Sequence, residues 1–104
     1  MARFDVCPNL HKSSRERVPY LLEIQTDLLS SLGTRLVAPL VPAAKFGPAA
    51  ERLNPSFRIG GKNYIMDAAL IAGVSGKILG DSVENISGNS TEILAAIDFL
   101  ISGI

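Results

Sequence analysis

The chain ends in one apolar stretch without a break, Thr91-Glu92-Ile93-Leu94-Ala95-Ala96-Ile97-Asp98-Phe99-Leu100-Ile101-Ser102-Gly103-Ile104. Leucine, alanine and glutamate favour helices, and residues 91–102 contain no proline or glycine. Ser87 or Ser90 is a suitable N-cap, and Glu92 suits the positive end of the helix dipole. Gly103 is typical of a residue that ends a helix. The sequence therefore predicts a C-terminal helix over residues 91–102.

The surface of this helix is unusually apolar. A surface helix normally has one apolar stripe and one polar face. Here apolar side chains occupy most of the circumference, and the remaining small and polar strip consists of Thr91, Ala95, Asp98 and Ser102. One interpretation is a helix that packs on a sheet and supports a homodimer. The other is that the strip and the Gly103-Ile104 end bind a different protein, and both can hold together.

Length and composition limit the class of protein. The 104 residues fit a single domain spanning 1–104, and a hydrophobic content of 47% rules against a disordered chain. No apolar run reaches the roughly 18–20 residues of a membrane span, and the N-terminus lacks the pattern of a signal peptide. We therefore expect no membrane contact and a cytoplasmic location. The lone Cys7 excludes an internal disulfide and fits a reducing compartment.

Charge is balanced overall but unevenly distributed. Up to Lys62 the chain has nine basic and five acidic residues, and beyond it one basic and five acidic residues. A protein that binds nucleic acid by neutralising phosphates is usually basic overall. Direct nucleic-acid binding is therefore not expected.

Residues 3–7 alternate between polar and apolar, the pattern of a half-buried strand, and residues 20–25 and 34–40 are predicted as the second and third strands. The alternation places Phe4 and Val6 on one face of the first strand. In the second strand the inner face consists of Tyr20, Leu22 and Ile24. Pro39 has no amide proton, so we expect it at a sheet edge or a bulge.

The rest of the chain continues the β pattern. Residues 41–55 are rich in proline, alanine and glycine and predict an irregular segment with one helical turn around residues 49–53. Residues 56–66 predict a hairpin built on Gly60-Gly61. Residues 69–79 predict one or two strands bent by a bulge. Short antiparallel strands followed by one helix indicate a mainly β, barrel-like fold with a helical appendix.

Most catalytic and metal sites are excluded by counting residues. One histidine, His11, and one cysteine cannot build a zinc site unaided, and we expect no cofactor. No serine lies in a GxSxG motif, and Gly60-Gly61-Lys62 lacks the spacing of a phosphate-binding loop. One catalytic hypothesis remains, in which Arg35 with Thr34, or Arg58 with Ser56, cleaves RNA without histidine.

The order of four motifs resembles the CcdB family of toxins from toxin–antitoxin systems. These motifs are Ile24-Gln25-Thr26-Asp27-Leu28-Leu29, Arg35-Leu36-Val37-Ala38-Pro39-Leu40, Leu53-Asn54-Pro55 and the closing Gly103-Ile104. The resemblance extends over nearly the whole chain, from Phe4 to Ile104. It implies an SH3-like antiparallel barrel of the CcdB/MazF type, a small extra sheet, a C-terminal helix and a homodimer.

The resemblance also implies a target and an inhibitor. Members of this family bind the A subunit of DNA gyrase and trap the enzyme on cleaved DNA. A cognate CcdA-like antitoxin neutralises them with a disordered C-terminal tail. The gyrase-binding residues that the resemblance implies are Ser102, Gly103, Ile104, Ile101, Asp98, Thr26, Leu28 and Leu29. The best-known members have tryptophan where this chain has Ser102, and this chain contains no tryptophan.

A basic loop is the candidate site for the antitoxin. Residues 10–17 are polar and mostly basic, and we expect Lys12, Arg15 and Arg17 to attract an acidic tail, although such a loop is also typical of a solvated connection. Two other functions stay open at this point. One is an mRNA endonuclease toxin like MazF, and the other is a decayed toxin that retains only antitoxin binding.

Overall fold

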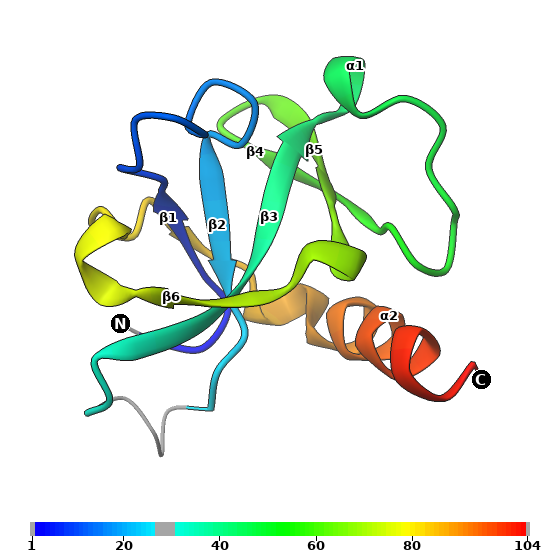
Figure 1. Ribbon diagram of the computed structural model, residues 1–104. Coiled ribbons are helices and arrows are strands. Elements are labelled where there is room, and N and C mark those ends of the chain that lie inside the picture. Colours follow the sequence, from blue (N-terminus) through cyan, green and yellow to red (C-terminus); the bar gives the residue numbers. More distant parts are fainter. Residues whose placement is uncertain (1, 27–30, 104) are drawn as a thin grey trace.

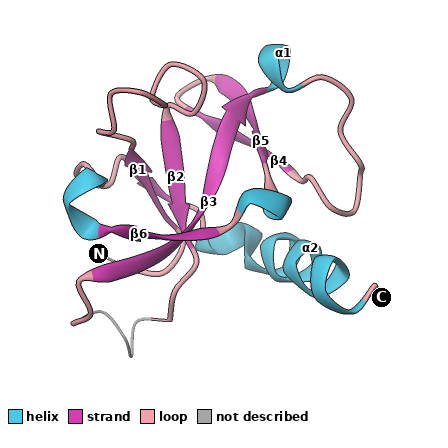
Figure 2. Cartoon of the chain, in the orientation of Figure 1, coloured by secondary structure: helices cyan, strands magenta, loops and turns pink. Residues whose placement is uncertain are grey.

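The computed structural model describes residues 2–26 and 31–103, which form one antiparallel sheet and a C-terminal helix (Figures 1 and 2). The strands are β1 (Asp5–Pro8), β2 (Tyr20–Glu23), β3 (Thr34–Pro42), β4 (Ser56–Ile59), β5 (Lys62–Met66), β6 (Ala72–Ser75) and β7 (Glu84–Asn85). The α-helices are α1 (Ala43–Phe46) and α2 (Ser90–Ser102). The single-turn 3₁₀ helices are η2 (Ala68–Leu70), η3 (Gly76–Ile78) and η4 (Ser87–Asn89).

The long strand β3 organises the sheet. The strand order is β4-β5-β3-β2-β1-β7, with β6 added to the side of β3, and every pair is antiparallel. Apolar side chains from β4 and from the residue after β7 meet in the same core, so the sheet curls into a nearly closed barrel. The predicted fold class, a mainly β barrel with one C-terminal helix, is confirmed.

Pro39 lies in this central strand and not at a sheet edge, so the edge prediction is wrong. Its backbone groups face away from β2, at the point where β3 changes partner on its other side. Pairing with β6 stops at Val37, and pairing with β5 starts at Leu40. The missing amide proton therefore costs no hydrogen bond to β2. On the other side, the Pro39 carbonyl accepts a hydrogen bond from the Asp67 N–H at 2.9 Å, and the Asp67 carbonyl accepts one from the Leu70 N–H at 3.1 Å. The small extra sheet implied by the resemblance is not separate, because β6 pairs with β3 and belongs to the same sheet.

The barrel interior contains the larger core cluster. Alternation along the strands turns every second side chain inward, and the predicted inner residues Phe4, Val6, Leu22 and Ile24 all belong to this core. Helix α2 closes the barrel with Ile93 and Ala96. The other members of the cluster are Ala38, Leu40, Phe57, Ile59, Tyr64, Met66, Ala68 and Ile86.

A second, smaller cluster lies on the outer face of β1, β2 and β3. It consists of Cys7, Val18, Leu21, Val37, Val41 and Leu79. Phe46, Val74 and Ile78 pack against it from α1, β6 and η3. The loop before β2 and the β6–η3 segment therefore cover a face of the sheet that would otherwise be apolar and exposed.

The hairpin of β4 and β5 is confirmed, and the segment after it differs from prediction. Gly60 and Gly61 have φ values of 56° and 83°, as a two-residue type I′ turn requires. Residues 69–79 were predicted as strand bent by a bulge, but they form the short β6 between η2 and η3. Strand β7 was not predicted, because two residues are too few for a periodic pattern.

Helix α2 ends as predicted but begins differently. Gly103 adopts a left-handed conformation with φ 73°, and its N–H donates to the Phe99 carbonyl at 2.9 Å. Neither predicted serine caps the start, since Asn89 holds the N-cap position and makes no side-chain cap. The η4 turn runs directly into Ser90, so the chain enters the helix already coiled.

Asp5 connects β1 to the segment that leads into α2. Its carboxylate accepts hydrogen bonds from the Asn85 side chain at 2.9 Å and from the Ala2 backbone N–H at 2.7 Å. Burial raises the pKa of the Asp5 carboxyl, but the hydrogen bonds together outweigh burial, and the pKa lies below its ordinary value of 3.8.

Replacement of Asp5 by asparagine is expected to lower the free energy of unfolding by about 1–3 kcal/mol near neutral pH. A lowered folded-state pKa contributes stability above the unfolded-state value, and this contribution is lost as the pH falls through the folded-state pKa. The difference between the two proteins should therefore shrink below about pH 4. Urea unfolding across this range measures it, with the exposed Asp81→Asn as the control. A difference that is the same at acidic and neutral pH would contradict the assignment.

Candidate functional site

The C-terminal half of α2 projects beyond the sheet that covers its first half (Figure 1). Ile93 and Ala96 are buried in the barrel core, and Leu94 and Ile97 pack against it. The same side continues to Leu100 and Ile101, because residues three, four and seven apart share a helix face. Ile101 is nevertheless 79% exposed, the largest value among the exposed large hydrophobic residues of the described chain. The helix therefore presents an apolar end that the rest of the described chain leaves uncovered.

The last turn of α2 is held by its own backbone. Ser102 Oγ donates to the Asp98 carbonyl at 2.7 Å, while the Gly103 N–H bonds to Phe99. Space around Gly103 is open, with no heavy atom within 4 Å of a Cβ built there. Four predicted gyrase-binding residues, Asp98, Ile101, Ser102 and Gly103, thus meet at one exposed tip.

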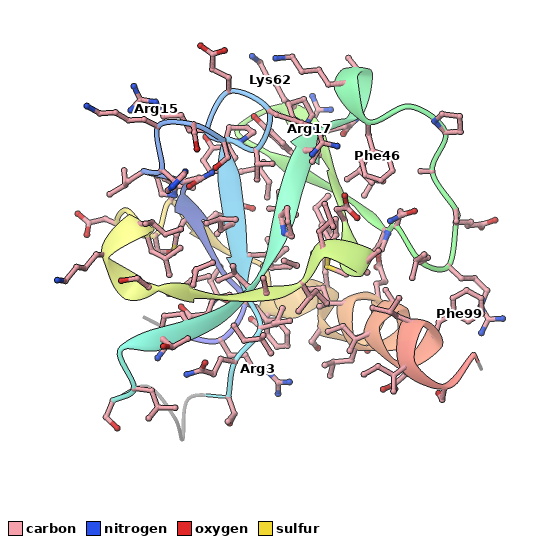
Figure 3. The ribbon with its side chains drawn as sticks, in the orientation of Figure 1. Arg3, Arg15, Arg17, Phe46, Lys62 and Phe99 are labelled. Carbon is pink, nitrogen blue, oxygen red and sulfur yellow. The ribbon has the colours of Figure 1, made fainter. Side chains whose placement is uncertain are left out.

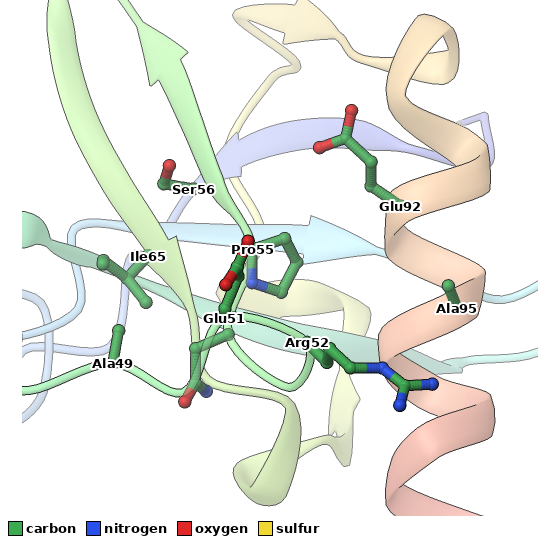
Figure 4. Close-up of a pocket in the computed structure, with 9 residues that line it drawn as sticks. Ala49, Glu51, Arg52, Pro55, Ser56, Ile65, Glu92 and Ala95 are labelled. Atoms are coloured by element: carbon green, nitrogen blue, oxygen red, sulfur yellow. The ribbon is translucent and has the colours of Figure 1, made fainter. Parts of the chain in front are cut away.

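Arg52 braces this tip from the irregular segment before β4. Its guanidinium carbon lies 4.5 Å from the centre of the Phe99 ring, in cation–π geometry. Figure 4 shows Arg52 reaching toward α2 across a groove, with Glu92 and Ala95 on the helix side. The groove has a volume of about 540 Å³. Sequence reasoning missed Arg52, because only the fold brings it to the helix.

The other predicted gyrase-binding residues are not gathered at this tip. Thr26 is half-buried at the end of the segment after β2, and Figure 1 shows that segment at the lower left, away from the C-terminus at the right. Leu28, Leu29 and Ile104 lie outside the described residues. Within one chain the structure therefore joins four of the predicted residues and leaves Thr26 apart.

The predicted antitoxin residues lie on the loop between β1 and β2. Lys12, Arg15 and Arg17 are all exposed. Loop 9–19 and hairpin 59–62 emerge at one end of the barrel, since Tyr20 pairs with Leu40 and β5 begins beside the end of β3. In Figure 3 Arg15, Arg17 and Lys62 accordingly lie at the top, far from Phe99. The basic end is thus separate from the helix tip.

Buried Asn9 shapes this basic loop. Its side-chain amide donates to the Val18 carbonyl at 2.9 Å and to Ser14 Oγ at 3.0 Å, and its Oδ1 accepts from the His11 N–H at 3.0 Å. These bonds close the loop into a compact turn, so its basic side chains extend from a fixed base. Sequence reasoning missed Asn9, because no local pattern indicates its three partners.

The structure removes one arginine from the catalytic hypothesis. Arg35 is only 4% exposed and forms an ion pair with Glu23, which is fully buried. A guanidinium enclosed in this way cannot reach an RNA phosphate beside Thr34. Arg58 and Ser56 are exposed on β4, two residues apart and hence on one side of the strand.

Cys7 and His11 offer little chemistry. Cys7 is fully buried, and burial raises the pKa of its thiol, with a further contribution from Asp5. It belongs to the smaller core cluster. His11 is exposed, and its Nδ1 lies 2.8 Å from Ser13 Oγ. Among residues 2–26 and 31–103, no three acidic, histidine or cysteine side chains are placed to hold a metal ion.

Comparison with protein families identifies the family of the chain. The family model described as CcdB protein matches residues 3–103. The chain belongs to the CcdB family. CcdB proteins are toxins of toxin–antitoxin systems and do not form a catalytic enzyme family. In the described part of this CcdB protein, no helix combines the length and the apolar character that crossing a membrane requires.

Proposed function

We propose that this CcdB protein binds the A subunit of DNA gyrase, traps the gyrase–DNA cleavage complex, and is neutralised by a CcdA-like antitoxin in the cytoplasm. The observation that carries the proposal is the exposed end of α2. The apolar side chain of Ile101 is mostly exposed and lies beside a left-handed glycine, an arrangement that favours close contact with a partner surface.

A homodimer is part of the proposal. The apolar side of α2 continues past the core to Leu100 and Ile101, and a second copy related by a two-fold axis would present two tips with the same symmetry as a gyrase A dimer. Thr26 and the α2 tip lie apart within one chain. In the dimer, Thr26 of one copy and the tip of the other would then contribute to one binding surface. Sedimentation equilibrium tests the dimer, and a monomer throughout the micromolar range would contradict it.

The decisive experiment is a DNA cleavage assay with purified gyrase. Supercoiled plasmid, gyrase, ATP and the protein are incubated, treated with detergent and protease, and separated by electrophoresis. Linear DNA that depends on the protein supports gyrase poisoning. Unchanged supercoiling with no linear DNA contradicts it.

The absence of an aromatic side chain at Ser102 supports a second candidate function. The Ser102 hydroxyl is turned back to the Asp98 carbonyl and presents no large surface to a partner. A toxin that has lost potency while retaining antitoxin binding would have this appearance. It predicts an inactive protein in the cleavage assay that still binds its antitoxin tightly. An mRNA endonuclease like MazF has weaker support, because Arg35 is enclosed by the sheet.

Charge reversal in the basic loop tests the antitoxin part of the proposal. Changing Lys12, Arg15 and Arg17 together to glutamate is expected to slow antitoxin association about tenfold or more at low salt, and to remove most of its salt dependence. These side chains are exposed, so they act mainly by long-range attraction and the fold should persist. Stopped-flow association at two ionic strengths measures the effect.

The matched control changes the same three residues to glutamine, which removes the attraction without adding repulsion. The antitoxin association rate of this variant should lie between those of the unmodified protein and the charge-reversed protein. Gyrase cleavage by the charge-reversed protein should be unchanged, because the loop and the α2 tip lie at different ends of the molecule. An association rate insensitive to all three charges would exclude the loop as the docking surface.

A further inference from the structure

The last turn of α2 has little support from the rest of the described chain. Of residues 98–103, Phe99 is half-buried and the other five are exposed. The Phe99 carbonyl also accepts the hydrogen bond from the Gly103 N–H that ends the helix. Helix ends fray where few contacts hold them. The order of the last turn therefore depends on what holds Phe99.

Arg52 holds Phe99 from the other side of the groove. Its guanidinium carbon lies 4.5 Å from the centre of the Phe99 ring. Glu92 and Ala95 line the groove that Arg52 crosses in Figure 4. Phe99 lies seven residues after Glu92 and four after Ala95, so it shares their helix face. Arg52 thus connects the far wall of the groove to the last turn of α2.

The turn that carries Arg52 is fixed to the barrel. The Asn54 N–H donates to the Ala50 carbonyl at 2.7 Å, and the Ala50 N–H donates to Asn54 Oδ1 at 3.1 Å. The Asn54 side-chain amide also donates to the carbonyl of Met66, the last residue of β5, at 3.1 Å. Leu53 packs against the larger core cluster. The backbone at Arg52 is therefore a firm base for its side chain.

An aromatic ring, and not a carboxylate, holds the Arg52 guanidinium. Glu51 and Glu92 line the same groove, but in the part of the chain that the structure describes Arg52 forms no salt bridge with either. Glu92 Oε1 instead accepts a hydrogen bond from the Asn89 side chain at 3.4 Å. A cation over a ring face is attracted by the quadrupole of the ring, and arginine also stacks on it. The contact therefore needs both the charge of Arg52 and the ring of Phe99.

We propose that Arg52 is a positioning residue for the α2 tip. Its contact with Phe99 keeps the last turn helical and so keeps residues 100–103 in the arrangement that a partner meets. The ordering of the tip stands on its own, whereas its consequence for gyrase rests on the proposed function. A partner that binds the ordered tip loses apparent affinity in proportion to the fraction of molecules in which the tip is disordered.

Amide hydrogen exchange measures the order of the last turn directly. Arg52→Met removes the charge and keeps an unbranched apolar side chain. The strength of an exposed cation–π contact corresponds to about a two- to fivefold change in an equilibrium constant. Exchange at residues 100–103 should therefore become about two- to fivefold faster in Arg52→Met, while exchange at Ile93 and Ala96 stays the same. Arg52→Lys keeps the charge and should recover most of the protection.

A double-mutant cycle tests the role of the ring. Phe99→Leu keeps an apolar side chain and removes the ring, so adding Arg52→Met to it should not speed up exchange any further. Arg58→Met is the matched control for the loss of charge, because Arg58 is exposed on β4 and does not line the groove. It should leave exchange in the last turn unchanged. Unchanged amide chemical shifts in the sheet show that each variant folds.

The DNA cleavage assay then tests the consequence for binding. Arg52→Met should need about two- to fivefold more protein than the unmodified chain to give half of the maximal linear DNA. Arg52→Lys should lie between the two. Equal potency of Arg52→Met and the unmodified protein, together with faster exchange in the last turn, would overturn the role of Arg52 in binding.

Two results would overturn the proposal as a whole: unchanged exchange of the last turn in Arg52→Met, or an equal effect of Arg52→Met with and without the Phe99 ring. Neither depends on gyrase. If the unmodified protein cleaves no DNA with gyrase while Arg52→Met loosens the last turn, the proposed target is refuted and the positioning role is supported. Cleavage by the unmodified protein, with a last turn that is insensitive to Arg52, would show the reverse.

Discussion

Replacing Gly103 with glutamate is expected to abolish gyrase-dependent DNA cleavage, a loss of about a hundredfold or more. Gly103 has φ 73°, a conformation that L-residues adopt at a cost of about 1 kcal/mol, so the last turn of α2 would rearrange. The new carboxylate would also stand beside exposed Ile101, where the proposed contact is apolar and close. Burying an unpaired charge in such a contact is strongly unfavourable.

The fold should survive this change. Apart from its chain neighbours, no heavy atom lies within 4 Å of a Cβ built on Gly103, and the buried residues of α2, Ile93 and Ala96, are about two turns or more away. Circular dichroism and urea unfolding should therefore match the unmodified protein within about 1 kcal/mol. The measurement is the fraction of linear plasmid at increasing protein concentration.

Gly88→Glu is the matched control for Gly103→Glu. Gly88 is exposed in η4, has equally open space for a side chain, and does not have the left-handed conformation. It adds the same charge at the opposite end of α2 and should leave cleavage unchanged. Equal activity of both variants would show that the α2 tip does not contact gyrase.

The parts of the fold that were predictable are those in which local chemistry decides structure. The hairpin at Gly60-Gly61 follows from two residues that tolerate positive φ, and the end of α2 follows from Gly103. The exposed tip could also be anticipated, since apolar residues around most of the helix exceed what one core contact buries. The position of Pro39 could not, because it depends on which strands flank β3 on the side away from β2.

The candidate sites likewise differ in how much of each could be predicted from the sequence. Exposure of Lys12, Arg15 and Arg17 follows from composition, whereas the role of Asn9 depends on three partners spread over the loop. Leu21 of β2 and Val74 of β6 line the same apolar cavity, although they are far apart in the chain. Contacts between residues far apart in the chain need the strand register, and a shift of one residue would exchange the two faces.

A buried ion pair provides the largest stability effect. Glu23 is fully buried on β2, and Arg35 is 4% exposed on β3, on the same outer face of the sheet. Changing Arg35 to methionine leaves the Glu23 carboxylate in an apolar environment without its partner. The free energy of unfolding is therefore expected to fall by about 3–5 kcal/mol. Urea unfolding at fixed protein concentration measures the loss, and exposed Arg58→Met should cost less than about 0.5 kcal/mol.

The double variant Glu23→Leu/Arg35→Met decides what the pair contributes. Apolar residues of similar volume often replace a buried ion pair at little cost, because the desolvation of two charges is no longer required. We therefore expect the double variant to recover most of the stability lost by Arg35→Met. The contribution of the pair would then lie in specificity: a one-residue slip of β3 against β2 would turn Arg35 toward the apolar barrel interior, a cost that methionine would not impose. A double variant less stable than Arg35→Met alone would contradict this argument.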